Sequence, residues 1–179
     1  MKLLHTVIIF LFVFIISCPV FANKTVDIHW TKFSIPDELK KNPEEEFVFE
    51  SKDNSRIQFV LGEKHKPNKK LQDQLNKDRK NATKDFISGY IPNTKAFYKQ
   101  RKLQYEHISG NDLNINEQQL VFKLIGKVSK GKNELFILVE YFYYYKGDLI
   151  IITAQCDKKL IGKYEKIFDD IVKSMTVKN

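Results

Sequence analysis

Residues 134–175 read ELFILVEYFYYYKGDLIIITAQCDKKLIGKYEKIFDDIVKSM, and this stretch decides the fold. Residues 135–145 are rich in β-branched and aromatic side chains that alternate between the two faces of an extended strand, and both faces are apolar. Gly147 interrupts this pattern with a residue that tolerates positive φ, and residues 149–154 then alternate again. The pattern predicts a β-hairpin. Because strands that are apolar on both faces are not half solvated, we expect helices to cover both sides of the sheet.

The second half of the stretch predicts an amphipathic helix. Its large apolar residues recur at spacings of three and four, and they are Leu160, Tyr164, Ile167, Phe168, Ile171, Val172 and Met175. Asp157 is placed to cap the N-terminus of this helix. Burial of a large apolar side chain stabilises the fold by about 1.5 to 3 kcal/mol before chain entropy is subtracted. We therefore expect the helix to be a main contributor to stability.

The first 22 residues differ from the rest and predict a signal peptide. Lys2 precedes an apolar block at residues 7–16, and the small-residue ending Val20-Phe21-Ala22 follows it. The block is shorter than the roughly 20 residues that a membrane-spanning helix needs. We therefore expect export of the chain, with residues 23–179 forming a single domain.

Residues 15–18, Ile-Ile-Ser-Cys, also resemble a bacterial lipobox, in which the cysteine is acylated and becomes the mature N-terminus. Cleavage after Ala22 and lipidation at Cys18 are therefore two alternatives. Both place the domain outside the cytoplasm. In the first case Cys156 is the only remaining cysteine, so the fold has no internal disulfide. Its position at the end of an apolar strand predicts a small buried side chain rather than a reactive nucleophile.

The charge pattern is basic without being diagnostic. The chain has 30 lysines and arginines against 22 acidic residues, a net charge of +8. Only Arg56, Arg79 and Arg101 are arginines, whereas proteins that read nucleic acids depend on guanidinium groups for phosphate and base contacts. We therefore expect no nucleic-acid partner. Weak peripheral contact with anionic lipid headgroups is compatible with this charge.

The chain between the leader and the C-terminal unit predicts mostly antiparallel strands with one surface helix. The expected elements are a strand at 26–35, a loop at 36–46, a hairpin formed by 47–49 and 57–61, a helix at 71–86 that ends at Gly89, a turn at 88–93, a strand at 96–108, a loop at 111–114 and a strand at 120–128. The last of these strands and the C-terminal hairpin form a three-stranded meander. This grouping of strands and helices is typical of the α+β class.

Two segments carry a resemblance to a known family. They are Phe33-Ser34-Ile35-Pro36-Asp37, which ends the first strand, and the closing unit Gly147-Asp148-Leu149-Ile150-Ile151-Ile152-Thr153-Ala154 with Tyr164, Ile167, Phe168, Ile171, Ser174 and Met175 behind it. Over residues 26–177 the chain resembles the PsbP and DcrB family of small exported domains. The resemblance implies an antiparallel β-sheet sandwiched by helices, an α/β/α arrangement. It also implies a protein without enzymatic activity, since members include an extrinsic photosystem subunit, envelope lipoproteins and chaperone-like domains.

Two groups of residues are candidates for a partner surface. One is the aromatic strand face of Tyr141, Tyr143 and Tyr145, and the other is the basic face of the helix at 71–86, with Lys77, Lys80 and Lys84. Tyrosine offers a large contact area with a polar tip and is enriched at interfaces. The alternative for the tyrosines is a core position beneath a helix. The alternative for the lysines is a solvated helix face laced with acidic residues.

Catalytic and metal-binding motifs are missing from the sequence. His29, His65 and His107 are scattered without the spacing of a metal site, and there is no Gly-x-Ser-x-Gly, glycine-rich phosphate loop or His-Glu-x-x-His. We therefore expect no metal, no cofactor and no enzymatic activity. The leading hypothesis is a non-catalytic exported domain, in the cell envelope or secreted, that binds a protein partner or supports an envelope assembly. Its rivals are a secreted enzyme or effector without a local motif, and a surface lipoprotein tethered through Cys18.

Overall fold

The computed structural model describes residues 23–178 except 29, 54–55, 68 and 117–118. The strands are β1 (Asn23–Ile28), β2 (Thr31–Pro36), β3 (Leu39–Lys41), β4 (Val48–Ser51), β5 (Gln58–His65), β6 (Gln104–Asn116), β7 (Gln119–Lys130), β8 (Asn133–Tyr145), β9 (Asp148–Cys156) and β10 (Thr176–Val177). The helices are α1 (Lys69–Lys77), α2 (Arg79–Gln100), the 3₁₀ turn η1 (Lys158–Leu160) and α3 (Ile161–Ser174). The expected signal peptide at residues 1–22, with Cys18, lies outside the described residues. Within the described part of the chain, no helix has the length and apolarity to cross a bilayer.

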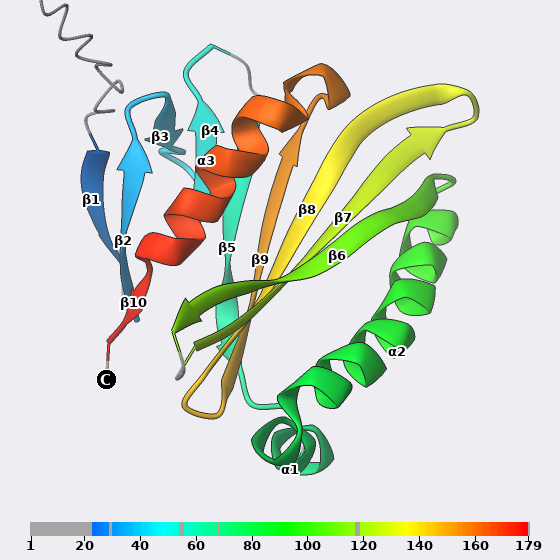
Figure 1. Cartoon of the computed structure of the whole chain (residues 1–179). Coiled ribbons are helices and arrows are strands. Elements are labelled where there is room, and N and C mark those ends of the chain that lie inside the picture. Colours follow the sequence, from blue (N-terminus) through cyan, green and yellow to red (C-terminus); the bar gives the residue numbers. More distant parts are fainter. Residues whose placement is uncertain (1–22, 29, 54–55, 68, 117–118, 179) are drawn as a thin grey trace, which may run out of the picture.

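The strands form two antiparallel sheets. The larger has seven strands in the order β3-β4-β5-β9-β8-β7-β6, and the smaller has the order β1-β2-β10. Helix α3 lies across one face of the large sheet, and α2 lies on the other side along β6 and β7 (Figure 1). The predicted α+β class, with a sheet between helices, is confirmed. Strands β6 to β9 are consecutive neighbours, so the meander has one strand more than the sequence predicted.

The C-terminal hairpin and helix form as predicted. Strands β8 and β9 pair in one register from Ile137 with Cys156 to Tyr145 with Asp148. Lys146 (φ 48°) and Gly147 (φ 85°) make the two-residue turn, and positive φ at both positions is what a tight hairpin with the natural strand twist requires. The predicted turn at Gly147 is therefore confirmed.

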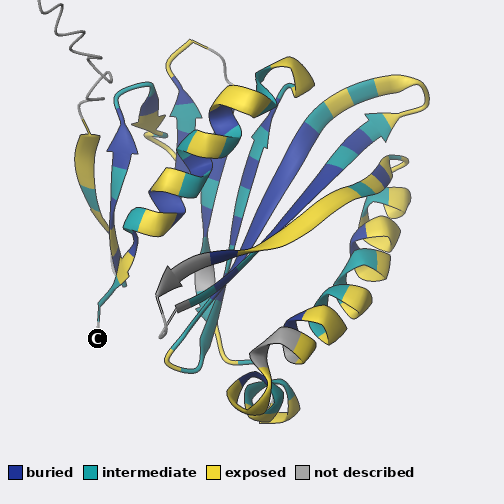
Figure 2. Ribbon diagram, viewed as in Figure 1, coloured by how far each residue is buried: buried dark blue, intermediate teal, exposed yellow. Residues whose placement is uncertain are grey.

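The main core lies between α3 and the large sheet. Figure 2 shows β8 mostly buried and α3 with one buried and one exposed side. The buried residues of α3 are Tyr164, Phe168, Ile171 and Val172. Phe168 packs on Phe59 of β5, with ring centroids 6.1 Å apart, and both side chains are fully buried. Burial of these helix side chains stabilises the fold by about 1.5 to 3 kcal/mol each, so α3 and the hairpin beneath it form one unit.

The start of this helix differs from the prediction. Asp157 precedes η1 and makes no side-chain hydrogen bond to the helix. Its backbone carbonyl accepts a hydrogen bond from the Leu160 N–H at 2.9 Å, and its carboxylate lies 3.7 Å from Arg56. A 3₁₀ turn thus leads into α3 where the sequence suggested a side-chain cap.

The N-terminal segment contains more strands than expected. The single strand predicted at 26–35 is a hairpin of β1 and β2, and the loop predicted at 36–46 contains β3. The interrupted alternation in the sequence marks the turn between β1 and β2. Ile28, Phe33 and Ile35 are all buried, so both strands of this hairpin contribute to the core. The hairpin predicted from 47–49 and 57–61 is confirmed as β4 and β5.

The helical region also differs from the prediction. The helix expected at 71–86 is two helices, separated at Asp78, whose carboxylate accepts a hydrogen bond from the backbone N–H of Asn81 at 3.2 Å and so caps α2. Helix α2 continues through Gly89 and Pro92, where a turn was expected. The strand expected from 96 begins at Gln104, and the loop expected at 111–114 lies within β6.

Candidate binding site

Two charged residues lie almost fully buried in the middle of the large sheet. Lys123 on β7 is 3% exposed, and Glu140 on β8 is 6% exposed. Lys123 is the register partner of Tyr141, and Glu140 is the register partner of Leu124. Neighbouring positions on a strand face opposite sides of the sheet, so Lys123 faces α3 and Glu140 faces α2. Each residue needs a partner on its own side because a buried charge is costly when unpaired.

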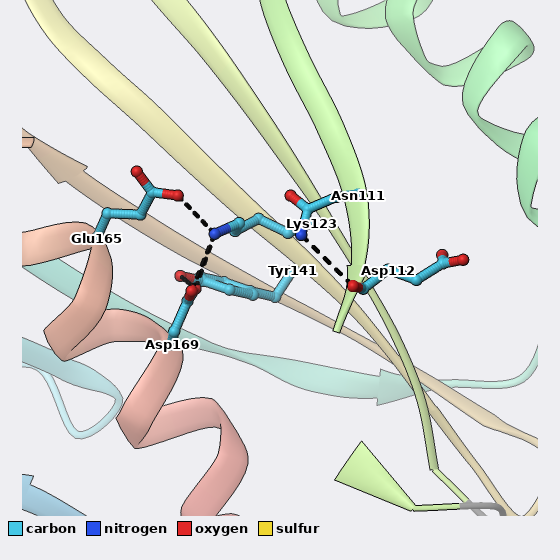
Figure 3. Close-up of polar contacts among 6 residues, drawn as sticks. All are labelled: Asn111, Asp112, Lys123, Tyr141, Glu165 and Asp169. Atoms are coloured by element: carbon cyan, nitrogen blue, oxygen red, sulfur yellow. Dashed lines mark hydrogen bonds and ion pairs between the residues drawn. The ribbon is translucent and has the colours of Figure 1, made fainter. Parts of the chain in front are cut away.

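The Lys123 side is fully paired (Figure 3). The Lys123 ammonium donates hydrogen bonds to Glu165 at 2.6 Å and to both oxygens of Asp169 at 2.9 and 3.1 Å. The Tyr141 hydroxyl donates to Asp169 at 2.7 Å. Burial lowers the pKa of Lys123, but its hydrogen bonds to the two carboxylates outweigh burial, and the pKa lies above its ordinary value. A lysine with its ammonium donors engaged in this way holds α3 on the sheet. It has few free donors with which to bind a ligand.

The Glu140 side is only half paired. The Tyr90 hydroxyl of α2 donates a hydrogen bond of 2.6 Å to Glu140 Oε1. Glu140 Oε2 is buried and has no hydrogen-bond partner among the described residues. Burial raises the pKa of Glu140 above its ordinary value, and the hydrogen bond from Tyr90 partly opposes that shift. An unpartnered buried carboxylate oxygen is uncommon in folded proteins and calls for an explanation.

A groove of about 480 Å³ runs beside Glu140, between α2 and strands β8 and β9. Its volume lies in the range of about 300 to 1,000 Å³ that is typical of ligand sites. The lining residues are Tyr90, Asn93, Thr94, Phe97, Tyr98, Leu138, Glu140 and Thr153. Glu140 is the only charged residue in this lining, which otherwise consists of aromatic, aliphatic and neutral polar side chains. We call this feature the Glu140 groove.

Aromatic packing fixes the helix that forms one wall of the groove. The rings of Phe86 and Tyr90 lie 5.1 and 4.7 Å from the ring of Phe142, both edge to face. Further along α2, Tyr98 stacks on Tyr105 of β6 at 5.8 Å. Helix α2 is thereby held to the sheet at both ends of the groove, so the groove is a preformed feature of the fold.

The predicted tyrosine surface is largely in the core. Tyr141 and Tyr143 are fully buried beneath α3, and Tyr145 is half-buried. Burial raises the pKa of Tyr143 to about 12. The sequence also allowed a core position for these tyrosines. Tyr141 and Tyr143 occupy such a position, so their side chains cannot contact a partner in this structure. The three tyrosines do not form the expected partner surface, because helix α3 covers the side chains of Tyr141 and Tyr143.

The three predicted lysines do not share one helix. Lys77 ends α1 and Lys84 lies on α2, and both are exposed. Lys80 also lies on α2, and its side chain is outside the described part. Figure 1 shows α1 and α2 running in different directions, so the basic face predicted for one continuous helix is divided between two.

The Glu140 groove was not predicted from the sequence. A signal was present, since Glu140 is the only charged residue in the apolar run 135–145. A lone carboxylate in a strand buried on both faces indicates a specific polar contact. Tyr90, its partner, was assigned to a turn, and a contact across 50 residues of sequence could not be inferred.

Metal-ligand side chains are not clustered among the described residues. No group of three or more histidine, cysteine, aspartate and glutamate side chains among them could hold a metal ion. The lining of the Glu140 groove contains no histidine, cysteine, lysine or second carboxylate.

Comparison with solved structures supports the fold. The chain is similar to the solution structure of cyanobacterial PsbP (CyanoP) from Synechocystis sp. PCC 6803, with a TM-score of 0.62, 13% sequence identity, and coverage of 90% of this chain and 95% of that chain. The prediction of a PsbP-like fold is confirmed by this likeness, which does not bear on the DcrB part of the resemblance. No protein-family model matches the sequence, and no curated protein matches it.

Proposed function

We propose that this protein is a non-catalytic exported domain that binds a protein partner through the Glu140 groove. The observation that carries the proposal is the unpartnered Oε2 of Glu140 beside a preformed groove lined by aromatic residues. Phe97 at the groove is 47% exposed, and aromatic side chains are enriched at protein interfaces. The PsbP-like fold is consistent with a binding role.

A photo-crosslinking residue at position 97 tests this proposal in the full chain, produced in its native host. The matched control carries the same residue in place of Ile108, which is 53% exposed on β6 and does not line the groove. We expect a discrete crosslinked protein from position 97 and not from position 108. The substitution Thr153→Phe places a ring in the groove and should abolish that crosslink without unfolding the chain.

Two results would contradict the proposal. One is the absence of a crosslinked protein from position 97 under conditions in which the chain is exported and folded. The other is a crosslinked protein whose yield is the same from position 108 or in the Thr153→Phe variant, because such contact would not depend on the groove.

Export itself is part of the proposal and has its own test. Cleavage after Ala22 would release a chain that begins with Asn23, the first residue of β1, whereas acylation at Cys18 would leave four residues between the lipidated cysteine and Asn23. Four extended residues span at most about 14 Å, so a lipid at Cys18 would hold the β1-β2 hairpin close to the bilayer. Mass spectrometry of the mature N-terminus separates the soluble form from the tethered lipoprotein, and an intact residue 1 would contradict export by either route.

A further inference from the structure

We propose that the Glu140 groove binds the ammonium group of a lysine side chain presented by the partner protein, with Glu140 as its counter-ion. This inference rests on the proposed function and names the chemistry that the groove recognises. It starts from Glu140 Oε2, a buried atom in the groove wall that has no hydrogen-bond partner among the described residues.

Burial and pairing of Glu140 indicate that a donor is missing. The side chain is 6% exposed, and Oε1 is occupied by the Tyr90 hydroxyl at 2.6 Å. Buried carboxylate oxygens in folded proteins almost always accept a hydrogen bond. A ligand that enters the groove can donate to Oε2. An ordered water molecule is the simpler occupant, and the experiment below separates the two.

The charge of the groove selects a cation. Glu140 is the only charged lining residue, so the protein supplies it with no counter-ion from the groove wall. Arg101, just beyond α2, is already engaged: its guanidinium lies over the Phe97 ring, 3.5 Å from the centroid, and donates to the Phe97 carbonyl at 3.2 Å. An ion pair with an entering cation would give the buried carboxylate the charge-assisted hydrogen bond that it lacks.

The remaining lining suits the rest of a lysine side chain. The rings of Tyr90 and Tyr98 line the groove, and aromatic faces attract cations within about 6 Å of the ring centroid. Leu138 provides an aliphatic contact for the methylene stem, which packs readily on apolar surface. The Thr153 hydroxyl provides a second oxygen for an ammonium donor.

The geometry favours lysine over arginine. A guanidinium binds a carboxylate best through two parallel hydrogen bonds, one to each oxygen. Oε1 of Glu140 already accepts from Tyr90, which leaves a single oxygen for the ligand. A compact ammonium can use one carboxylate oxygen together with a hydroxyl and ring faces. It therefore forgoes fewer of its preferred hydrogen bonds at this site than the guanidinium of an arginine.

Binding of a cation should be linked to proton release. Burial raises the pKa of Glu140, so part of the empty protein carries a protonated carboxyl in the acidic range, and an ammonium partner lowers that pKa again. The titratable groups that face Glu140 are Tyr90 and Tyr98 of α2 and Tyr105 of β6. Burial, followed by the charge of Glu140, raises the pKa of each, so all three stay protonated. Affinity should therefore rise with pH as Glu140 ionises.

The test is an NMR titration of the full mature chain with the peptide acetyl-Gly-Lys-Gly-amide, following the amide signals of β8 and β9. We expect saturable shifts with a dissociation constant on the order of 1 mM, as for one anchored side chain. Glu140→Gln should weaken binding by roughly 30-fold, at the lower end of what loss of one partner of a buried charge pair causes. Glu106→Gln removes an exposed carboxylate on β6 and should change affinity by less than about twofold.

A second variant protects the test against misfolding of Glu140→Gln. Thr153→Val keeps a β-branched side chain at a half-buried position of β9 and should fold, and loss of the hydroxyl that accepts from the ammonium should weaken binding by about two- to fivefold. The matched ligand is the same peptide with an acetylated lysine, which keeps the stem and removes the charge. It should produce no saturable shifts.

Several outcomes would overturn the inference. Equal binding of the acetylated peptide, unchanged affinity in both Glu140→Gln and Thr153→Val, or tighter binding of the arginine peptide would each do so. Absence of any shift would mean that water fills the site. Butylamine that binds as tightly as the lysine peptide would identify a site for free amines rather than a docking site. If crosslinking from position 97 persists in Glu140→Gln, the proposed function stands and this inference fails.

Discussion

Tyr90 and Glu140, 50 residues apart in the sequence, join α2 to the central strand β8 through a hydrogen bond of 2.6 Å. On the opposite face of the sheet, Lys123 joins β7 to α3 through Glu165 and Asp169. Each helix is thus fastened to the sheet by one buried charged residue. The two contacts differ in their hydrogen bonding, because the Lys123 ammonium has its donors engaged, whereas Glu140 Oε2 has no partner among the described residues. We therefore interpret the Lys123 cluster as structural and the Glu140 groove as a candidate binding site.

The Lys123 cluster should be a major source of stability. Lys123→Met keeps most of the side-chain volume and removes the charge, which leaves the carboxylates of Glu165 and Asp169 without their cation. We expect a loss of about 2 to 3 kcal/mol in the free energy of unfolding, below the 3 to 5 kcal/mol of fully buried pairs because both carboxylates are partly exposed. Urea unfolding at neutral pH measures it.

An exposed ion pair on α3 provides the control. Lys166 and Asp170 are four residues apart and largely exposed. Lys166→Met should change stability by no more than about 0.5 kcal/mol. Equal effects of the two substitutions would show that the Lys123 cluster is not a stabilising contact.

The elements with strong periodicity were predictable from the sequence. Strands β8 and β9 and helix α3 follow from alternation and from three- and four-residue spacing, since their buried residues are apolar apart from Glu140. The turn at Gly147 follows from local chemistry because few other residues adopt its positive φ. These elements satisfy local and tertiary preferences together, so local rules suffice.

Helix α2 could not be predicted because tertiary packing outweighs local preference there. Gly89 and Pro92 are both unfavourable inside a helix, so the sequence predicted a helix that ends at Gly89. Tyr90, which lies between them, and Tyr98, which follows them, pack against Phe142 and Tyr105 of the sheet, and this burial stabilises the continuous helix. The Glu140 groove depends on that helix, so it was missed for the same reason.

Substitution at Gly89 tests the continuity of α2. Gly89 lies inside the helix, and a Cβ atom built there meets nothing within 4 Å. Gly89→Ala should therefore stabilise the chain by about 1 kcal/mol, since alanine has the higher helix propensity. A shift of the urea midpoint to higher concentration measures the gain. Destabilisation would indicate a turn with positive φ at this position.

Cys156 should be inert in the folded chain. Its side chain is fully buried, and burial raises the pKa of the thiol to about 12. The reactive thiolate is therefore scarce at pH 8, and reagents cannot reach the sulfur. We expect Ellman's reagent to react only after unfolding in urea, at a rate limited by opening of the structure. Complete reaction of the native mature chain within minutes would contradict this placement.

Glu140 should make stability depend on pH in a direction opposite to that of most carboxylates. Its pKa is raised in the folded chain by burial, so the folded state binds the proton more tightly than the unfolded state. The contribution of Glu140 to stability is therefore greatest below the ordinary pKa of 4.5, and it is lost as pH rises through the raised pKa. Glu140→Gln removes this titration, so the variant should gain stability relative to the wild type between pH 4 and 8.

The Tyr90→Phe substitution sharpens this test. The Tyr90 hydrogen bond lowers the pKa of Glu140, so its removal should raise that pKa further and extend the loss of stability to higher pH. Glu106→Gln is the control of opposite sign, because the hydrogen bond from Lys127 lowers the pKa of Glu106 and favours the folded state at higher pH. Urea unfolding of the four proteins across this range measures each slope. If the wild type and Glu140→Gln show parallel profiles, then Glu140 has the same pKa in the folded and unfolded chains, and its carboxylate cannot be the buried, half-paired group on which the groove depends.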